Sequence, residues 1–134
     1  MGRCVETTVS YALRCCLVAI IVALPLQAWA QTTRTLRPAT LRAGPDPAFP
    51  AVTPLQPNSL VHVFGCLGGW VWCDVASGRS RGWVQSSYLA TFFRDRTPIV
   101  TFSVESYWDE HYQRSPWYSQ RSQWLNWAAP AARR

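Results

Sequence analysis

Apolar and polar residues alternate along the middle of the chain with the period of two that is typical of β-strands. In residues 59–66, Val61 and Val63 fall on one face of the predicted strand, and the residues flanking them fall on the other. Residues 70–75 and 82–84 are rich in the aromatic and β-branched residues that strands favour. This pattern predicts an all-β domain in which each of these segments contributes a strand.

Turn signals separate these segments at intervals of about ten residues between 35 and 93, which is typical of a small sandwich or barrel. Residues 35–44 are expected to supply one strand, interrupted at Pro38, and residues 77–81 are expected to form a turn. Residues 44–58 contain five prolines, which exclude a helix or a central strand. A long, stiffened loop is therefore predicted there.

The start of the chain has the features of a secretory signal. Arg3 and Arg14 accompany an apolar run at 17–26, and a small-x-small cleavage site follows at 28–30. The apolar run is shorter than the ~20 residues that a membrane-spanning helix needs. We expect cleavage near Ala30 and a periplasmic or secreted bacterial protein, with an uncleaved membrane anchor as the alternative.

Two cysteines, Cys66 and Cys73, remain after this cleavage site. An exported protein meets an oxidising environment, where a single pair of cysteines is expected to form a disulfide. Their spacing differs from the C-x-x-C of a redox motif, and His62 and His111 add too little for an ordinary zinc site. We therefore expect a structural disulfide and neither a metal ion nor a cofactor.

The cysteines flank Gly68 and Gly69, which are expected to turn the chain between two strands because glycine adopts the positive φ angles of tight turns. The disulfide then joins the two arms of a hairpin. Alternation predicts that the second arm turns Val71, Cys73 and Val75 toward the core, and Trp70, Trp72 and Asp74 away from it.

Three segments resemble the pattern of a bacterial SH3-like domain (SH3b): "LRAGPD" at 41–46, "GW" at 69–70 and "RGWVQSSYL" at 81–89. They occur in the order and spacing of that family, with the Pro-rich loop after the first. The resemblance covers residues 35–93 and implies a small barrel of about five or six strands with a short helical turn near 86–89. It also implies a binding module for cell-wall peptide or glycopeptide.

Aromatic residues of the barrel supply the candidate ligand site. Trp83 is expected in the core, because it lies within a strand beside apolar neighbours. Trp70, Trp72 and Tyr88 are expected to line a surface groove between the Pro-rich loop and the hairpin, with partial burial beneath the rest of the chain as the alternative. Asp46 is expected either to give this groove a polar edge or to cap a turn.

The predicted organisation is a signal peptide at 1–30, a linker at 31–34, the barrel at 35–93 and an Arg- and aromatic-rich extension at 94–134. The extension is expected to be partly irregular or short-helical. Its aromatic residues either pack on the barrel and enlarge a small core, or form a docking surface for a partner or a membrane. The residues expected to dock are Tyr107, Trp108, Trp117, Trp124 and Trp127.

Composition narrows the function. Thirteen basic residues stand against seven acidic ones, giving a net charge of +6, but the charge is scattered and no nucleic-acid partner is expected. No nucleophile–base arrangement typical of a hydrolase is visible, so we expect a protein that is not an enzyme. We expect an exported module that binds cell-wall peptide or a periplasmic protein; the alternative is a structural or assembly protein whose extension docks to an envelope partner or a membrane surface.

Overall fold

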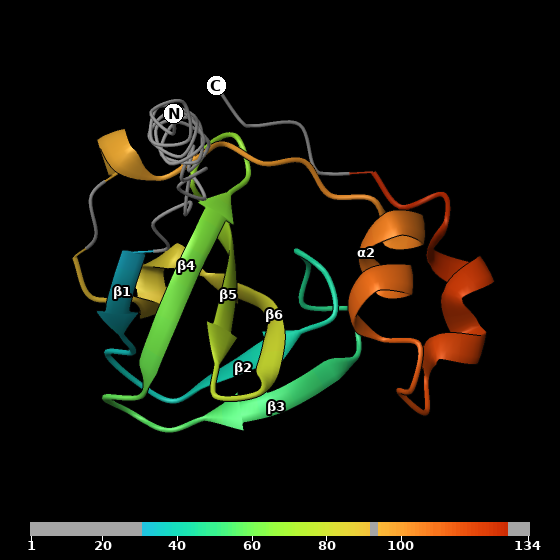
Figure 1. The fold of residues 1–134 in the computed structure, drawn as a ribbon, viewed down its shortest axis with the longest axis horizontal. Coiled ribbons are helices and arrows are strands. Elements are labelled where there is room, and N and C mark those ends of the chain that lie inside the picture. Colours follow the sequence, from blue (N-terminus) through green and yellow to red (C-terminus); the bar gives the residue numbers. More distant parts are fainter. Residues whose placement is uncertain (1–30, 92–93, 129–134) are drawn as a thin grey trace, which may run out of the picture.

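The computed structural model describes residues 31–91 and 94–128, so the predicted signal peptide lies outside the described residues. Six strands form one antiparallel sheet in the order β1-β4-β5-β6-β2-β3 (Figure 1). The sheet builds a small SH3-like all-β fold, as predicted. The C-terminal part of the chain, orange to red in Figure 1, lies against one side of it.

The strands are β1 (Gln31–Arg34), β2 (Ala39–Arg42), β3 (Ala51–Leu55), β4 (Leu60–Cys66), β5 (Trp72–Ser77) and β6 (Ser80–Gln85). The helical segments are short: 3₁₀ turns at Ser86–Tyr88, Arg94–Arg96 and Tyr118–Trp124, and helix α2 at Val104–His111. The first 3₁₀ turn is the short helical turn implied near 86–89, and α2 confirms the short-helical character expected of the C-terminal extension.

Two segments contain strands where the sequence predicted a linker or a loop. Residues 31–34, predicted as a linker, form β1 and pair along their whole length with β4. Residues 51–55, predicted as part of a long loop, form β3 at the edge of the sheet, where the missing N–H of Pro54 leaves no neighbouring strand unpaired. In residues 35–44, Pro38 precedes rather than interrupts a strand, because β2 begins after it.

The hairpin of β4 and β5 holds the predicted disulfide. Cys66 and Cys73 are bonded, lie directly opposite each other in the strand register and are fully buried. Gly69 has a φ of 89°, as the turn requires, and Trp70 follows with a φ of 60°. The prediction that Val71 faces the core is wrong: it is 58% exposed, because β5 begins only at Trp72.

The interior of the barrel is an aliphatic core around the disulfide. Val61 and Val63 are both buried there, which confirms the alternation predicted for β4 and shows that their face is the inner one. Leu41 from β2, Val75 from β5 and Val84 from β6 complete its centre. All five side chains are at most 1% exposed, so the barrel has a closed core of its own.

A second core lies between the barrel and α2 (Figure 1). Helix α2 buries Val104, Tyr107 and Trp108, which share one face at a spacing of three and four residues. On the barrel side these residues meet Phe49 and Trp83. The burial of Trp83, predicted from the sequence, is thus confirmed, but its neighbours come from the extension rather than from the barrel interior.

The segment that leads to α2 packs against the end of β4. The backbone N–H of Cys66 donates to the carbonyl of Pro98 at 3.0 Å, and the N–H of Val100 donates to the carbonyl of Cys66 at 2.9 Å. A Cβ atom on Gly65 would collide with the side chain of Val100. Glycine at this position therefore lets the segment leading to α2 lie directly on the strand.

Candidate functional site

An open groove of about 370 Å³ lies over β2. Its walls combine prolines and aromatic rings with a few polar groups. The residues that matter most for its chemistry are Pro38, Pro47, Pro54, Trp72, Tyr88, Thr40, Arg42, Gln56 and Gln85. Flat apolar walls with sparse polar groups are typical of sites that hold a peptide or another extended ligand.

The sheet register explains why these side chains converge. Thr40 and Arg42 are two apart on β2, so they share the face that Ala39 and Leu41 turn away from. Thr40 lies opposite Pro54 on β3. On the other side of the groove, Trp72 of β5 lies opposite Gln85 of β6, so both side chains leave the sheet on the same face.

The groove brings together two of the four residues predicted for ligand binding. Trp72 and Tyr88 line it, whereas Trp70 and Asp46 are not among its lining residues. The ring of Trp70 packs against the barrel core, and the Arg94 guanidinium lies 5.9 Å from its centre. An Asp46 carboxylate oxygen accepts a 2.8 Å hydrogen bond from the N–H of Ala48, which is the turn-capping role.

Two arginines at this groove were not singled out from the sequence. Arg42 lines it and donates to the carbonyl of Phe49 at 3.2 Å. The guanidinium of Arg37 lies 4.6 Å from the centre of the Tyr88 ring, so it stands beside the groove. Alternation along β2 places Arg42 on the outer face, but no local pattern shows that β3 and Trp72 form walls on either side of it.

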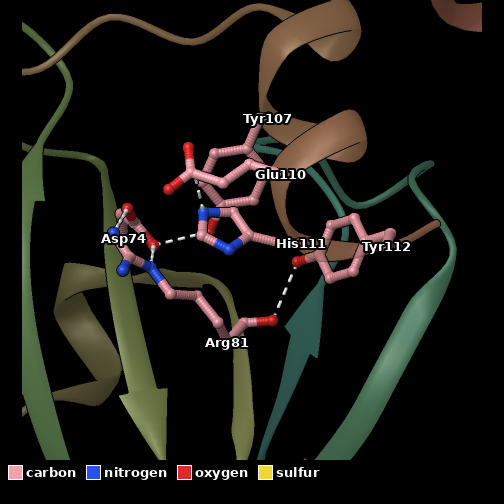
Figure 2. A network of polar contacts seen from close by, with 6 residues as sticks. All are labelled: Asp74, Arg81, Tyr107, Glu110, His111 and Tyr112. Atoms are coloured by element: carbon pink, nitrogen blue, oxygen red, sulfur yellow. Dashed lines mark hydrogen bonds and ion pairs between the residues drawn. The ribbon is translucent and has the colours of Figure 1, made fainter. Parts of the chain in front are cut away.

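A buried polar network joins β5 and β6 to α2 (Figure 2). The carboxylate of Asp74 is held by both ends of the Arg81 guanidinium, at 3.0 and 2.7 Å. It also accepts a 2.6 Å hydrogen bond from the hydroxyl of Tyr107, and the hydroxyl of Tyr112 donates to the Arg81 carbonyl at 2.8 Å. The prediction that Asp74 faces away from the core holds only for the barrel alone, because α2 covers that face and leaves Asp74 5% exposed.

The electrostatics of this network favour a structural role, in which it fastens α2 to the barrel, over a role as an acid–base centre. Burial raises the pKa of Tyr107, with the charge of Asp74 acting in the same direction, so its hydroxyl stays a hydrogen-bond donor. Burial acts to lower the pKa of Arg81, and the hydrogen bond and charge of Asp74 outweigh it, so the pKa is raised. Burial, followed by the charge of Arg81, lowers the pKa of His111.

The structure answers the open question about the aromatic extension for its first residues. Tyr107 and Trp108 are 9% and 0% exposed and face the barrel, which is the alternative in which the extension packs on it. The indole N–H of Trp108 donates to the carbonyl of Ala43 at 2.8 Å. Trp117, Trp124 and Trp127 are half-buried, and their rings contact the same second core.

Other kinds of site are not seen in ranges 31–91 and 94–128. No group of three or more histidine, cysteine, aspartate or glutamate side chains lies close enough there to hold a metal ion. None of the helices in the same ranges combines the length and apolar character needed to cross a membrane.

Comparison with known proteins shows one similarity, and it lies in the barrel. Residues 38–90 match the family described as the bacterial SH3 domain. The match runs from the start of β2 to the residue after the bridge between Thr35 and Leu89, and therefore spans the groove. Searches of curated proteins and of solved structures found no match. Over residues 38–90, about two fifths of the chain, the protein is therefore similar to the bacterial SH3 domain family.

Proposed function

We propose that this protein is an exported binding module that holds an extended cell-wall peptide in the groove over β2. Bacterial SH3 domains are generally non-catalytic binding modules and are often associated with the cell wall. The observation that carries the proposal is the groove itself. Trp72, Tyr88 and three prolines give it flat walls, and Gln56 and Gln85 offer amides for a peptide backbone.

Two features support export. A disulfide such as Cys66–Cys73 forms and persists mainly in oxidising compartments. The first thirty residues carry the basic start, apolar run and cleavage site of a secretory signal. A protein released in this way reaches the compartment where wall peptides are exposed, which fits the proposed ligand.

The alternative of an assembly protein that docks through its extension has less support. Tyr107 and Trp108 would have to leave the barrel before a partner met them, and each is buried in the second core. Leaving would also expose the carboxylate pairing of Asp74 with Arg81 and Tyr107. The extension is better explained as part of the fold that supports the groove.

The test is retention of the purified protein on purified peptidoglycan at low and high salt, comparing Trp72→Ala with Trp70→Ala. The two tryptophans are two residues apart, but only Trp72 lines the groove. We expect Trp72→Ala to cost at least about 1 kcal/mol of binding, roughly fivefold in Kd, as buried aromatic contacts usually do. Trp70→Ala is expected to bind like the wild type.

Thermal unfolding of both variants checks that the barrel remains folded under the binding conditions. Retention that survives high salt points to the aromatic walls, because simple attraction of arginines to an anionic polymer is screened. Equal loss in both variants, or no retention of the wild-type protein, would exclude the groove as a wall-binding site.

A further inference from the structure

We infer that the groove selects peptides that carry free carboxylates, and that Arg42 is the residue that recognises them. This inference rests on the proposed function, because it names the ligand chemistry of the same groove. Two guanidiniums stand at the groove: Arg42 among its lining residues and Arg37 beside Tyr88.

The guanidinium of Arg42 is held in place by one hydrogen bond, and its other N–H groups can donate to a ligand. One terminal nitrogen donates to the Phe49 carbonyl at 3.2 Å, which tethers the half-buried side chain against the loop after β2. A guanidinium has five N–H donors in a planar fork, and a carboxylate accepts two of them side by side. The tether lowers the entropy that binding would otherwise cost, since the guanidinium is already ordered.

Arg37 is held at the other end of β2. Its guanidinium lies over the ring of Tyr88, and one nitrogen is 3.5 Å from the carbonyl oxygen of Ser87. Strand β2 rises about 10 Å from Ala39 to Arg42 at ~3.3 Å per residue, and Arg37 lies two residues before it, so an extended peptide of a few residues would span the two cations. The two cations therefore suit a short extended ligand with a carboxylate near each end.

Within the described residues, no carboxylate lies in ion-pair contact with Arg42 or Arg37. Four of the described acidic residues instead lie on α2 or beneath it, each close to a basic side chain: Asp74, Glu105, Asp109 and Glu110. Asp46 is the acid nearest in sequence to the groove residues, and it caps its own turn. The positive charge of the groove is thus left for a ligand to neutralise.

An acidic peptide is the occupant that this arrangement favours. Prolines and aromatic rings along the walls suit an extended peptide backbone, and the forked guanidinium of Arg42 suits a carboxylate. A short cell-wall peptide with free carboxyl groups is a ligand of this chemistry, which ties the inference to the proposed function.

The test is calorimetric titration of the full protein with two synthetic stem tetrapeptides, one with free carboxyl groups and one with these groups amidated. We expect the free form to bind about tenfold more tightly, because hydrogen bonds to charged groups are the stronger ones. Arg42→Gln is expected to remove this preference, and Arg42→Lys to restore only part of it. Arg79→Gln, at an exposed arginine in the β5–β6 turn, makes the same change in net charge away from the groove and is expected to keep the preference.

Arg37→Gln, at an exposed position, provides a second variant in case Arg42→Gln does not fold, and it is expected to weaken the preference for the free peptide in part.

Equal binding of the two peptides, with both lost in Trp72→Ala, would overturn the inference and leave the proposed function intact. Equal weakening by Arg79→Gln and Arg42→Gln would also overturn it, since overall charge would then be the cause. Arg42-dependent binding of the free peptide without retention on peptidoglycan would support the inference and remove the proposed function. Failure of every peptide to bind would remove both.

Discussion

The barrel has two aromatic faces, and the chain covers only one of them. Around Phe49 and Trp83 the extension closes over the sheet, so that rings from α2 and the segment after it fill the space. Over β2, the rings of Trp72 and Tyr88 stand beside an open groove. The comparison teaches that a high aromatic content does not itself mark a binding surface; what decides is whether the same chain buries those rings.

Charge follows the same division. On the covered side, Asp74 is neutralised by Arg81, and Asp109 by Arg121 at 3.2 Å. On the open side, Arg42 donates to the backbone carbonyl of Phe49, and no carboxylate of the described residues forms an ion pair with it. On the covered face these acidic charges are paired within the chain, although the indole N–H groups of Trp83 and Trp124 have no hydrogen-bond partner there. On the open face, Arg42 keeps donors that a ligand would use.

The strongest test of this comparison removes the ring at the centre of the covered face. Trp108 is fully buried and its indole N–H is bonded to the Ala43 carbonyl. Trp108→Ala is expected to lower the free energy of unfolding by about 3–5 kcal/mol, the range for buried tryptophans. Trp72 is only half-buried: it lines the groove and its other side packs against the second core, so Trp72→Ala is expected to cost less, about 1 kcal/mol. Urea unfolding followed by far-ultraviolet circular dichroism measures both.

If Trp108→Ala and Trp72→Ala shifted the urea midpoint equally, the distinction between a covered and an open face would fail. A second unfolding transition in the wild type would contradict it differently. It would mean that the extension leaves the barrel before the barrel unfolds, and that the second core is not part of one cooperative unit.

A smaller substitution tests whether the polar network, and not only the aromatic rings, stabilises the packing of the extension on the barrel. Tyr107→Phe keeps the ring and removes one donor to the buried Asp74 carboxylate, which retains Arg81. The expected loss is about 1–2 kcal/mol, in the range for a hydrogen bond to a charged group. Tyr118→Phe is the matched control, because its hydroxyl also donates to an aspartate at 2.6 Å, but within the extension. A much smaller loss is expected there, and equal losses would show that the barrel contact has no special weight.

Local patterns predicted the barrel side of this comparison well. Val61 and Val63 alternate cleanly and are buried, and "RGWVQSSYL" at 81–89 forms β6 and the 3₁₀ turn after it. The pairing of Cys66 with Cys73 followed from parity and compartment. These features depend on neighbours within a few residues or on a strong family pattern, which is why sequence alone was sufficient.

The misses arise from contacts between distant segments. Residues 31–34 become a strand only because β4 offers an edge, and residues 51–55 because the edge position tolerates a proline. Asp74 is buried by α2, which lies about thirty residues later in the chain. Arg42 becomes a groove residue through walls supplied by β3 and Trp72. No local periodicity carries this information.

The smallest expected effect is a pH dependence confined to the covered face. The ring of His111 lies 4.5 Å from that of Tyr107, and the charged groups around it are Arg81, Asp74 and Glu110. Burial and the charge of Arg81 lower its pKa below the unfolded value of ~6.5. As the pH falls through that value, the unfolded chain takes up the proton before the folded one does, so folding stability is lost toward acid.

Urea midpoints measured between pH 7 and pH 5 are therefore expected to fall slightly in the wild type and to flatten in His111→Gln. His62→Gln, at an exposed histidine on β4, controls for the loss of a histidine as such. The titration should also leave binding by the groove unchanged over the upper part of this range, because His111 lies on the covered face. A slope that survives in His111→Gln would assign the acid sensitivity to another group. If the affinity of the groove for its ligand fell in parallel with the urea midpoint, the two faces would be coupled. Protonation of His111 on the covered face would then change binding in the groove.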